Sequence, residues 1–99
     1  MSFRESIKHV DGDNRGDITL YALSTCGWCR KTKGMLNDMG VEYAYVDVDL
    51  LKEDDRKEAL AQIKIHNPKC SFPTMVINNH RCIIGFSEQE TREALSIAD

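Results

Sequence analysis

The chain has 99 residues, of which 41% are hydrophobic and 29% charged, and its formal net charge is −3. This length suits one domain with one modest core, and the composition is that of a folded protein, not of a disordered one. The slightly acidic balance lacks the basic footprint of nucleic-acid-binding proteins, and no apolar run approaches the roughly 18 residues of a membrane span. We therefore expect a protein that binds neither nucleic acid nor membrane.

The first 17 residues are polar and charged and carry no apolar signal-peptide core. The turn-rich run Asp11–Gly16 ends this segment, so we predict an N-terminal arm over residues 1–17 and one folded domain over residues 18–99. Because no secretion signal is visible, we expect a cytoplasmic protein. In that reducing compartment, a closely spaced cysteine pair is usually catalytic or metal-binding.

The pattern from residue 18 onward predicts a strand, a helix and a strand. Ile18–Leu23 is an apolar, β-prone run, Cys29–Met39 has apolar residues at helical spacing, and Val41–Val48 is rich in Val and Tyr. Gly40 is a suitable residue to end the helix. This order predicts two parallel strands joined by a right-handed crossover.

A second helix and a hairpin follow. Glu53–Ile65 predicts the helix, and Thr74–Ile77 and Arg81–Ile84 predict two strands. Asn78–Asn79 lies between these strands, and asparagine tolerates the left-handed backbone of a tight turn.

A final helix is predicted after Ser87, which forms a capping box with Glu90 three residues later. The inner stripe of this helix is expected to hold Thr91, Ala94, Leu95 and Ala98. The complete order, βαβ-α-ββα, predicts an α/β protein, namely an α/β/α sandwich around a four-stranded mixed sheet.

The motif Cys26-Gly27-Trp28-Cys29 lies where the first predicted strand turns into the first helix. A helix N-terminus presents unpaired N–H groups and a partial positive charge, which both favour a thiolate over a thiol. The thiolate is the form that attacks a disulfide, and two intervening residues let the second sulfur reach the first. We therefore predict a redox dithiol with Cys26 as the exposed nucleophile and Cys29 as the shielded resolving thiol.

The same pair could instead form half of a zinc site. Such a site needs four ligands, usually as two short-spaced pairs, and the sequence holds one such pair. The other two cysteines, Cys70 and Cys82, are far apart, and no second C-x-x-C occurs. We therefore favour dithiol chemistry and expect a monomer without a bound metal or cofactor.

Over residues 18–98 the sequence resembles the glutaredoxin family of the thioredoxin superfamily. The resemblance rests on Cys26-Gly-Trp-Cys29, on Ser71-Phe72-Pro73 before a strand, and on Gly85 before the last helix. It implies a thioredoxin-like fold and a dithiol–disulfide oxidoreductase that reduces protein disulfides. It also implies a cis peptide bond before Pro73, with Pro73 facing the active cysteine and the backbone beside it pairing with the substrate chain. Phe72 is then expected near the Cys26 sulfur, where it helps to shape a substrate groove.

Two positions depart from the glutathione-using members of that family. Those members usually carry a lysine three residues before the first cysteine, where this chain has Leu23, and Gly-Gly where it has Gly85-Phe86. Gly-Phe at this place resembles the glutaredoxin-like electron donors of ribonucleotide reductase. We therefore expect a thioredoxin-reductase-like or ferredoxin-dependent reductase to reset the pair, with glutathione as the alternative reductant.

Trp28 is placed by the motif beside the reactive cysteine, and a large exposed apolar side chain there is a mark of an interaction site. We interpret Trp28, Phe72 and Phe86 as a docking surface for disulfide-containing protein substrates. The plain alternative is that Trp28 packs against its own loop. Cys70 is either an auxiliary thiol or an inert loop cysteine, and Cys82 is expected in the core.

Two rival functions share the same motif. In the first, a dimer carries an iron–sulfur cluster between two Cys26 residues, as glutaredoxin relatives can do with glutathione as an extra ligand. In the second, the domain is a redox-inactive interaction module, which the presence of both cysteines disfavours.

Overall fold

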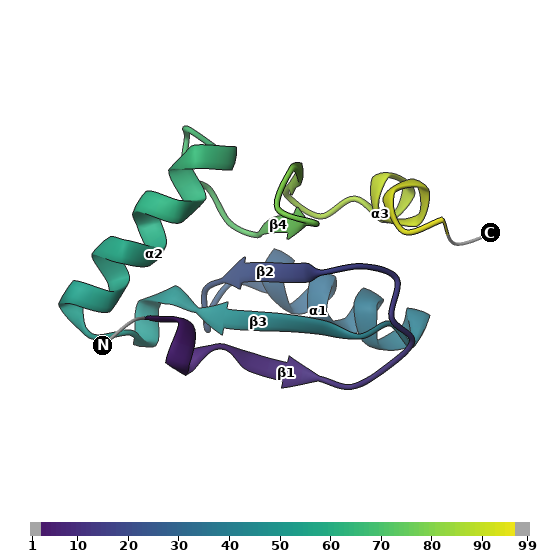
Figure 1. The fold of residues 1–99 in the computed structure, drawn as a ribbon, viewed down its shortest axis with the longest axis horizontal. Helices are drawn as coiled ribbons and strands as arrows, with labels where there is room; N and C mark the ends of the chain where they lie inside the picture. The colour runs from purple at the N-terminus through teal and green to yellow at the C-terminus, as the bar shows by residue number, and fades with distance from the viewer. Residues whose placement is uncertain (1–2, 97–99) are drawn as a thin grey trace.

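The computed structural model describes residues 3–96 (Figure 1). Its elements, in chain order, are η1 (Phe3–Ser6), β1 (Lys8–Val10), β2 (Ile18–Ala22), α1 (Gly27–Met39), β3 (Tyr43–Asp47), η2 (Val48–Leu50), α2 (Glu53–His66), β4 (Thr74–Ile77), β5 (Arg81–Ile84) and α3 (Glu88–Ala94). Across these residues no helix combines the length and the apolar character that crossing a bilayer requires.

The strands form one mixed sheet in the order β1-β3-β2-β4-β5, and Figure 1 shows β1, β3 and β2 side by side. β2 and β3 are parallel, as the strand–helix–strand order predicts, with Leu20 opposite Tyr45. The other three pairs, β1 with β3, β2 with β4, and β4 with β5, are antiparallel. The sheet thus places β2, the strand that leads into the cysteine motif, at its centre.

Each face of the sheet carries its own core, because successive side chains of a strand point to opposite faces. On one face, Leu20 packs with residues of α1 and with Leu95, which follows α3. On the other face, Tyr21 packs with Ala59 and Ile63 of α2. Helices therefore cover both faces, which confirms the predicted α/β/α sandwich, and α1 lies behind the sheet in Figure 1.

The predicted strand count was too low, because the sheet has five strands and not four. The additional strand, β1, comes from the segment expected to be an arm, and it pairs with the edge of β3. Just before it, Phe3 is fully buried, with its ring centroid 6.1 Å from that of Tyr21. The backbone N–H of Phe3 also donates to Glu58 Oε1 of α2 at 3.0 Å. The N-terminal segment is thus packed on the sandwich.

The element ends largely follow the local signals. Gly40 ends α1 with a left-handed backbone (φ 69°), and Asn78 and Asn79 both have positive φ in the hairpin turn. The Glu90 N–H donates to Ser87 Oγ, as the capping box predicts. Helix α1 begins at Gly27, two residues earlier than expected. Ala98, predicted on the inner stripe of the last helix, lies outside the described residues.

We predict that Phe3→Ala lowers the free energy of unfolding by about 3 to 5 kcal/mol, as loss of a buried aromatic side chain does. The control, Ile65→Ala, removes a side chain that is 67% exposed on α2, and it should change the stability by no more than about 0.5 kcal/mol. Urea unfolding followed by circular dichroism measures both. Equal, small effects would show that Phe3 is not part of the core in solution.

Candidate active site

Cys26 is the N-cap residue of α1. Its backbone is extended (φ −88°, ψ 121°), and its sulfur accepts a hydrogen bond from the backbone N–H of Cys29 at 3.2 Å. Serine, threonine and aspartate usually supply the capping atom, so here a sulfur takes the place of an oxygen. The cap directs the unpaired N–H groups of the first helical turn at the thiol.

The pKa of the Cys26 thiol is lowered from its ordinary value. Partial burial acts in the opposite direction, but it is outweighed by hydrogen bonds from the Cys29 side chain and from the backbone of Cys29 and Trp28. The positive charge of Arg30 adds to the lowering. Each of these contacts favours the thiolate, so Cys26 is chemically suited to attack a disulfide.

Cys29 has the opposite properties. It is completely buried in the core between α1 and the sheet. Burial raises its pKa to about 12, and the hydrogen bond that it donates to Cys26 and the negative charge there act in the same direction. In the reduced pair, Cys26 is therefore the more acidic thiol, and Cys29 is the thiol that holds its proton.

The loop before β4 carries Phe72 and Pro73, and the peptide bond between them is cis, as the family resemblance implies. Phe72 is half-buried and packs against the same core cluster as Cys26. The buried Asn67 side chain holds this loop, because it donates to Ser71 Oγ at 3.1 Å and to Thr74 Oγ1 at 2.9 Å.

Trp28 and Phe86 form an exposed aromatic pair beside the cysteines. Their ring centroids are 6.0 Å apart with an interplanar angle of 29°, although α1 and the residue before α3 are far apart in sequence. Trp28 remains 58% exposed, and Lys31 Nζ lies 4.8 Å from the centre of its ring. Trp28 thus packs on Phe86 and still presents a large apolar face to solvent.

An acidic residue that the sequence analysis left without a role holds the loop in front of Cys26. Asp49 in η2 accepts two hydrogen bonds from Ser24, one from the backbone N–H at 2.8 Å and one from the hydroxyl. These bonds lower the pKa of the Asp49 carboxyl. No pattern in the sequence indicates this contact, because Ser24 and Asp49 are 25 residues apart in the chain.

The other two cysteines are not part of the Cys26–Cys29 hydrogen-bonded pair. Cys70 has a left-handed backbone (φ 53°) and lies half-buried beside the core under α2. Cys82, expected in the core, is only half-buried on β5, and burial raises its pKa. For Cys70, an auxiliary thiol and an inert loop cysteine therefore both stay predictions.

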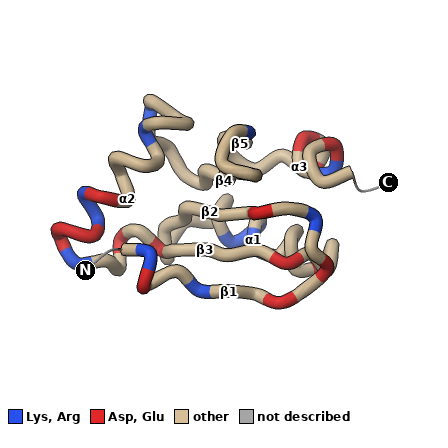
Figure 2. Tube along the Cα trace, in the orientation of Figure 1, with Lys and Arg blue, Asp and Glu red and all other residues tan. Residues whose placement is uncertain are grey.

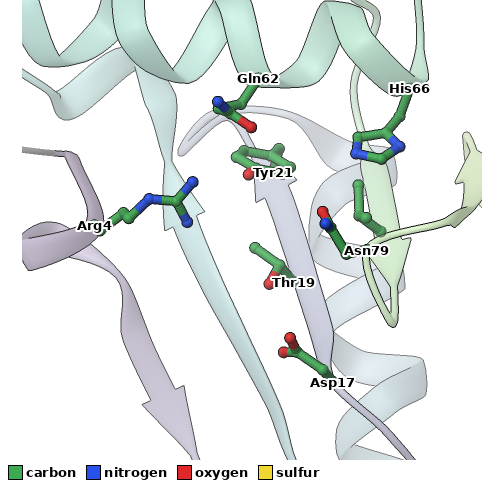
Figure 3. Close-up of a pocket in the computed structure, with 8 residues that line it drawn as sticks. Arg4, Asp17, Thr19, Tyr21, Gln62, His66 and Asn79 are labelled. Atoms are coloured by element: carbon green, nitrogen blue, oxygen red, sulfur yellow. The ribbon is translucent and has the colours of Figure 1, made fainter.

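Two of the cavities in the described residues differ in their position relative to the cysteine pair. A cavity of about 380 Å³ lies between α1 and the start of α3, and Lys31, Met35 and Phe86 are among its lining residues. A second cavity of about 260 Å³ is lined by Arg4, Tyr21 and six other residues, none of them from α1 or its preceding loop (Figure 3). The first cavity alone is continuous with the aromatic pair through Phe86.

One group of potential metal ligands occurs in residues 3–96. His9, Asp11 and Glu42 offer ligand atoms within 4.8 Å of one another at the β1–β3 edge of the sheet. Neither Cys26 nor Cys29 belongs to it, so the cysteine motif and this surface group are separate features.

We predict that Cys29→Ala raises the pKa of Cys26, because the variant removes a thiol that donates to the Cys26 sulfur. At a pH below the midpoint of the Cys26 titration, the variant then forms less Cys26 thiolate than the wild-type protein, and its alkylation is slower. The pH dependence of Cys26 alkylation by iodoacetamide, followed by peptide mass spectrometry, measures the midpoint, and Cys82→Ala is the matched control. An unchanged or lower midpoint in Cys29→Ala would contradict this account of the thiolate.

Comparisons with known proteins agree with this geometry. The family model described as glutaredoxin matches residues 18–82. The structure resembles that of the glutaredoxin from Methanosarcina mazei Go1, with 47% identity, a TM-score of 0.86, and coverage of 91% of this chain and 87% of that one. It also resembles methanoredoxin from Methanosarcina acetivorans, with 50% identity, a TM-score of 0.83, and coverage of 85% and 88%.

Among curated sequences, glutaredoxin 1 of Rickettsia bellii is 32% identical over 63% of this chain, and the match spans 62% of the length of that protein. The family match extends over more than half of the chain and includes the cysteine motif, the Phe72–Pro73 loop and strands β2 to β4. The chain therefore belongs to the glutaredoxin family of thiol–disulfide oxidoreductases.

Proposed function

We propose that this protein reduces disulfide bonds in other proteins, with Cys26 as the nucleophile and Cys29 as the resolving thiol. The main observation behind the proposal is that two neighbouring sulfurs have opposite exposure and opposite acidity. Cys26 is partly exposed with a lowered pKa, whereas Cys29 is buried and holds its proton. Cys26 is thus suited to the first attack, and Cys29 to the later resolving step.

The reaction proceeds in two exchanges. The Cys26 thiolate attacks one sulfur of the target disulfide, a mixed disulfide forms, and the other target sulfur leaves as a thiolate that takes up a proton. Cys29 then loses its proton and attacks the Cys26 sulfur. The bond between Cys26 and the target breaks, the second target sulfur leaves as a thiolate, and it receives the proton that Cys29 lost. The target gains two electrons and two protons, and the Cys26–Cys29 disulfide remains.

Trp28, Phe72 and Phe86 form the proposed docking surface for the target, and Pro73, whose side chain is buried, contributes to it as the residue that follows Phe72 in the loop. The exposure of the Trp28–Phe86 pair supports this assignment, because an apolar patch of this kind beside a reactive thiol favours contact with a protein partner. Phe72 shares the core cluster on which Cys26 packs, and Asn67 restrains its loop. A rigid loop and an exposed aromatic pair would then flank the bound disulfide.

The proposed electron donor is a thioredoxin-reductase-like or ferredoxin-dependent reductase. Leu23 supports this choice, because it is half-buried against the core under α2 and offers no positive charge to a glutathione carboxylate. Phe86 supports it as well, because its ring stacks on Trp28 where a glycine would leave open space. A protein reductase can instead use the aromatic pair as a contact surface.

We expect the wild-type protein to accelerate reduction of insulin disulfides by dithiothreitol, and we expect Cys26→Ser to be inactive because it lacks the attacking sulfur. The turbidity of precipitating insulin chains measures the rate, and dithiothreitol alone gives the background. Activity of Cys26→Ser at the wild-type rate would contradict the assigned nucleophile.

The same preparation tests the donor. When the oxidised protein is offered excess glutathione, the Cys26–Cys29 disulfide should persist, whereas dithiothreitol should open it. Alkylation and mass spectrometry count the free thiols. Ready opening by glutathione would overturn the preference for a protein reductase and leave the disulfide chemistry intact.

A further inference from the structure

The resolving step poses a chemical problem that the cysteine pair does not solve alone. Cys29 must attack as a thiolate, yet its burial in the core disfavours any charge there. When Cys26 is held in a mixed disulfide, it no longer carries the negative charge that also keeps Cys29 protonated. The cost that remains is burial, and a nearby positive charge is the direct way to reduce it.

Lys33 is placed to supply that charge. It lies four residues after Cys29 on α1, so both side chains lie on the same face of the helix one turn apart. Its side chain is largely buried, with only 22% of its surface exposed. A backbone hydrogen bond at Leu23 lowers the pKa of Cys29, and the positive charge of Lys33 acts in the same direction.

Two contacts from β3 hold Lys33 in this place. Its Nζ lies 3.0 Å from Asp47 Oδ1, and the Asp47 side chain is only 15% exposed. The same Nζ lies 4.2 Å from the ring centre of Tyr45, a cation–π distance. Asp47 pairs in register with Ala22, the last residue of β2 before the active-site loop. The sheet thus anchors the Lys33 ammonium at the end of β3, next to the end of β2 from which the active-site loop begins.

The other cations of α1 are arranged differently, although Figure 2 shows basic residues gathered on this helix. Arg30 and Lys31 are exposed, and Lys31 lies over the Trp28 ring. Arg30 acts on Cys26, whose pKa it helps to lower. Of these three side chains, Lys33 is the one that is half-buried and paired with the sheet.

We propose that Lys33, anchored by Asp47 and Tyr45, is a positioning residue that stabilises the Cys29 thiolate in the resolving step. This inference rests on the proposed function, in which Cys29 resolves the mixed disulfide. Lys33 takes no part in bond making. The charged or titratable side chains that act on Cys29 are Cys26 and Lys33. Arg30 in turn acts on Cys26, Tyr45 and Asp47 of β3 contact Lys33, and Asp49 of η2 holds Ser24 in the loop before Cys26.

The size of the expected effect follows from thiol chemistry. Raising the pKa of a thiol by one unit lowers its thiolate fraction roughly tenfold at a pH well below the pKa. The more basic thiolate is also more nucleophilic, with a Brønsted coefficient of about 0.4 to 0.5, which returns roughly threefold. A loss of the Lys33 charge should therefore slow resolution about threefold for each unit of pKa.

A two-phase experiment separates attack from resolution. The protein, with Cys70 and Cys82 replaced by Ser so that they do not interfere, is mixed with an aromatic disulfide that releases a coloured thiolate. The first phase reports attack by Cys26 and depends on reagent concentration. The second phase reports the release of the aromatic group from Cys26 by Cys29, and its rate does not depend on reagent concentration. In this assay the aromatic thiolate leaves unprotonated, and the Cys29 proton passes to solvent.

In Lys33→Met, we expect the second phase to slow by threefold or more at neutral pH and its pH profile to shift to higher pH, with the first phase unchanged. Lys33→Arg should restore the second phase, because it keeps the charge. Lys31→Met, which removes an exposed cation of the same helix, should leave the second phase at the wild-type rate. Circular dichroism confirms that each variant is folded.

The double variant Lys33→Met with Asp47→Asn excludes a trivial cause. If resolution stays slow, the missing cation is responsible, as proposed. If the wild-type rate returns, the unpaired Asp47 carboxylate slowed the single variant, and the proposal is wrong. An unchanged second phase in Lys33→Met would overturn it as well. Absence of a second phase in the wild-type protein would instead contradict the assignment of Cys29 as the resolving thiol.

Discussion

The Cys26 sulfur caps the N-terminus of helix α1, and the chemistry of the site depends on this one contact. The extended backbone of Cys26 ends the active-site loop, and its Sγ accepts the hydrogen bond from the Cys29 N–H that closes the first turn. The same contact favours negative charge on Cys26 and sets Cys29 within the first turn of the helix, where the core excludes water. If the helix began at another residue, the two thiols would differ neither in their exposure nor in their acidity.

The surrounding structure holds this cap from three separate segments. The pairing of β2 with both β3 and β4 determines where the strand ends and the loop begins. Asp49 then restrains Ser24 in that loop, and Asn67 restrains the segment that carries Phe72 and Pro73. Because these contacts are polar and directional, they orient the loops in a way that apolar packing alone would leave less specific.

Local patterns in the sequence predicted the central elements well. The Ser87 cap, the left-handed Gly40 and the two asparagines of the hairpin each follow from the intrinsic conformational preference of one or two residues. β1 escaped prediction because it has three residues, mostly exposed, and is defined by its partner strand rather than by any periodicity of its own. The contacts of Asp49 with Ser24 and of Lys33 with Asp47 join separate segments of the chain, so no spacing rule predicts them. Asn67, in contrast, bonds residues of its own loop only four and seven positions away. The cis bond before Pro73 was expected from family resemblance alone and is confirmed.

The central claim is that Cys26 attacks and Cys29 resolves. Its most direct test is Cys29→Ser, incubated in reduced form with a protein that contains a single disulfide and analysed by mass spectrometry without reductant. The account predicts a stable one-to-one mixed disulfide through Cys26, because the variant lacks the thiol that the account assigns to its release. A variant that released the reduced target as fast as the wild-type protein, or that was linked through Cys70 or Cys82, would contradict the account.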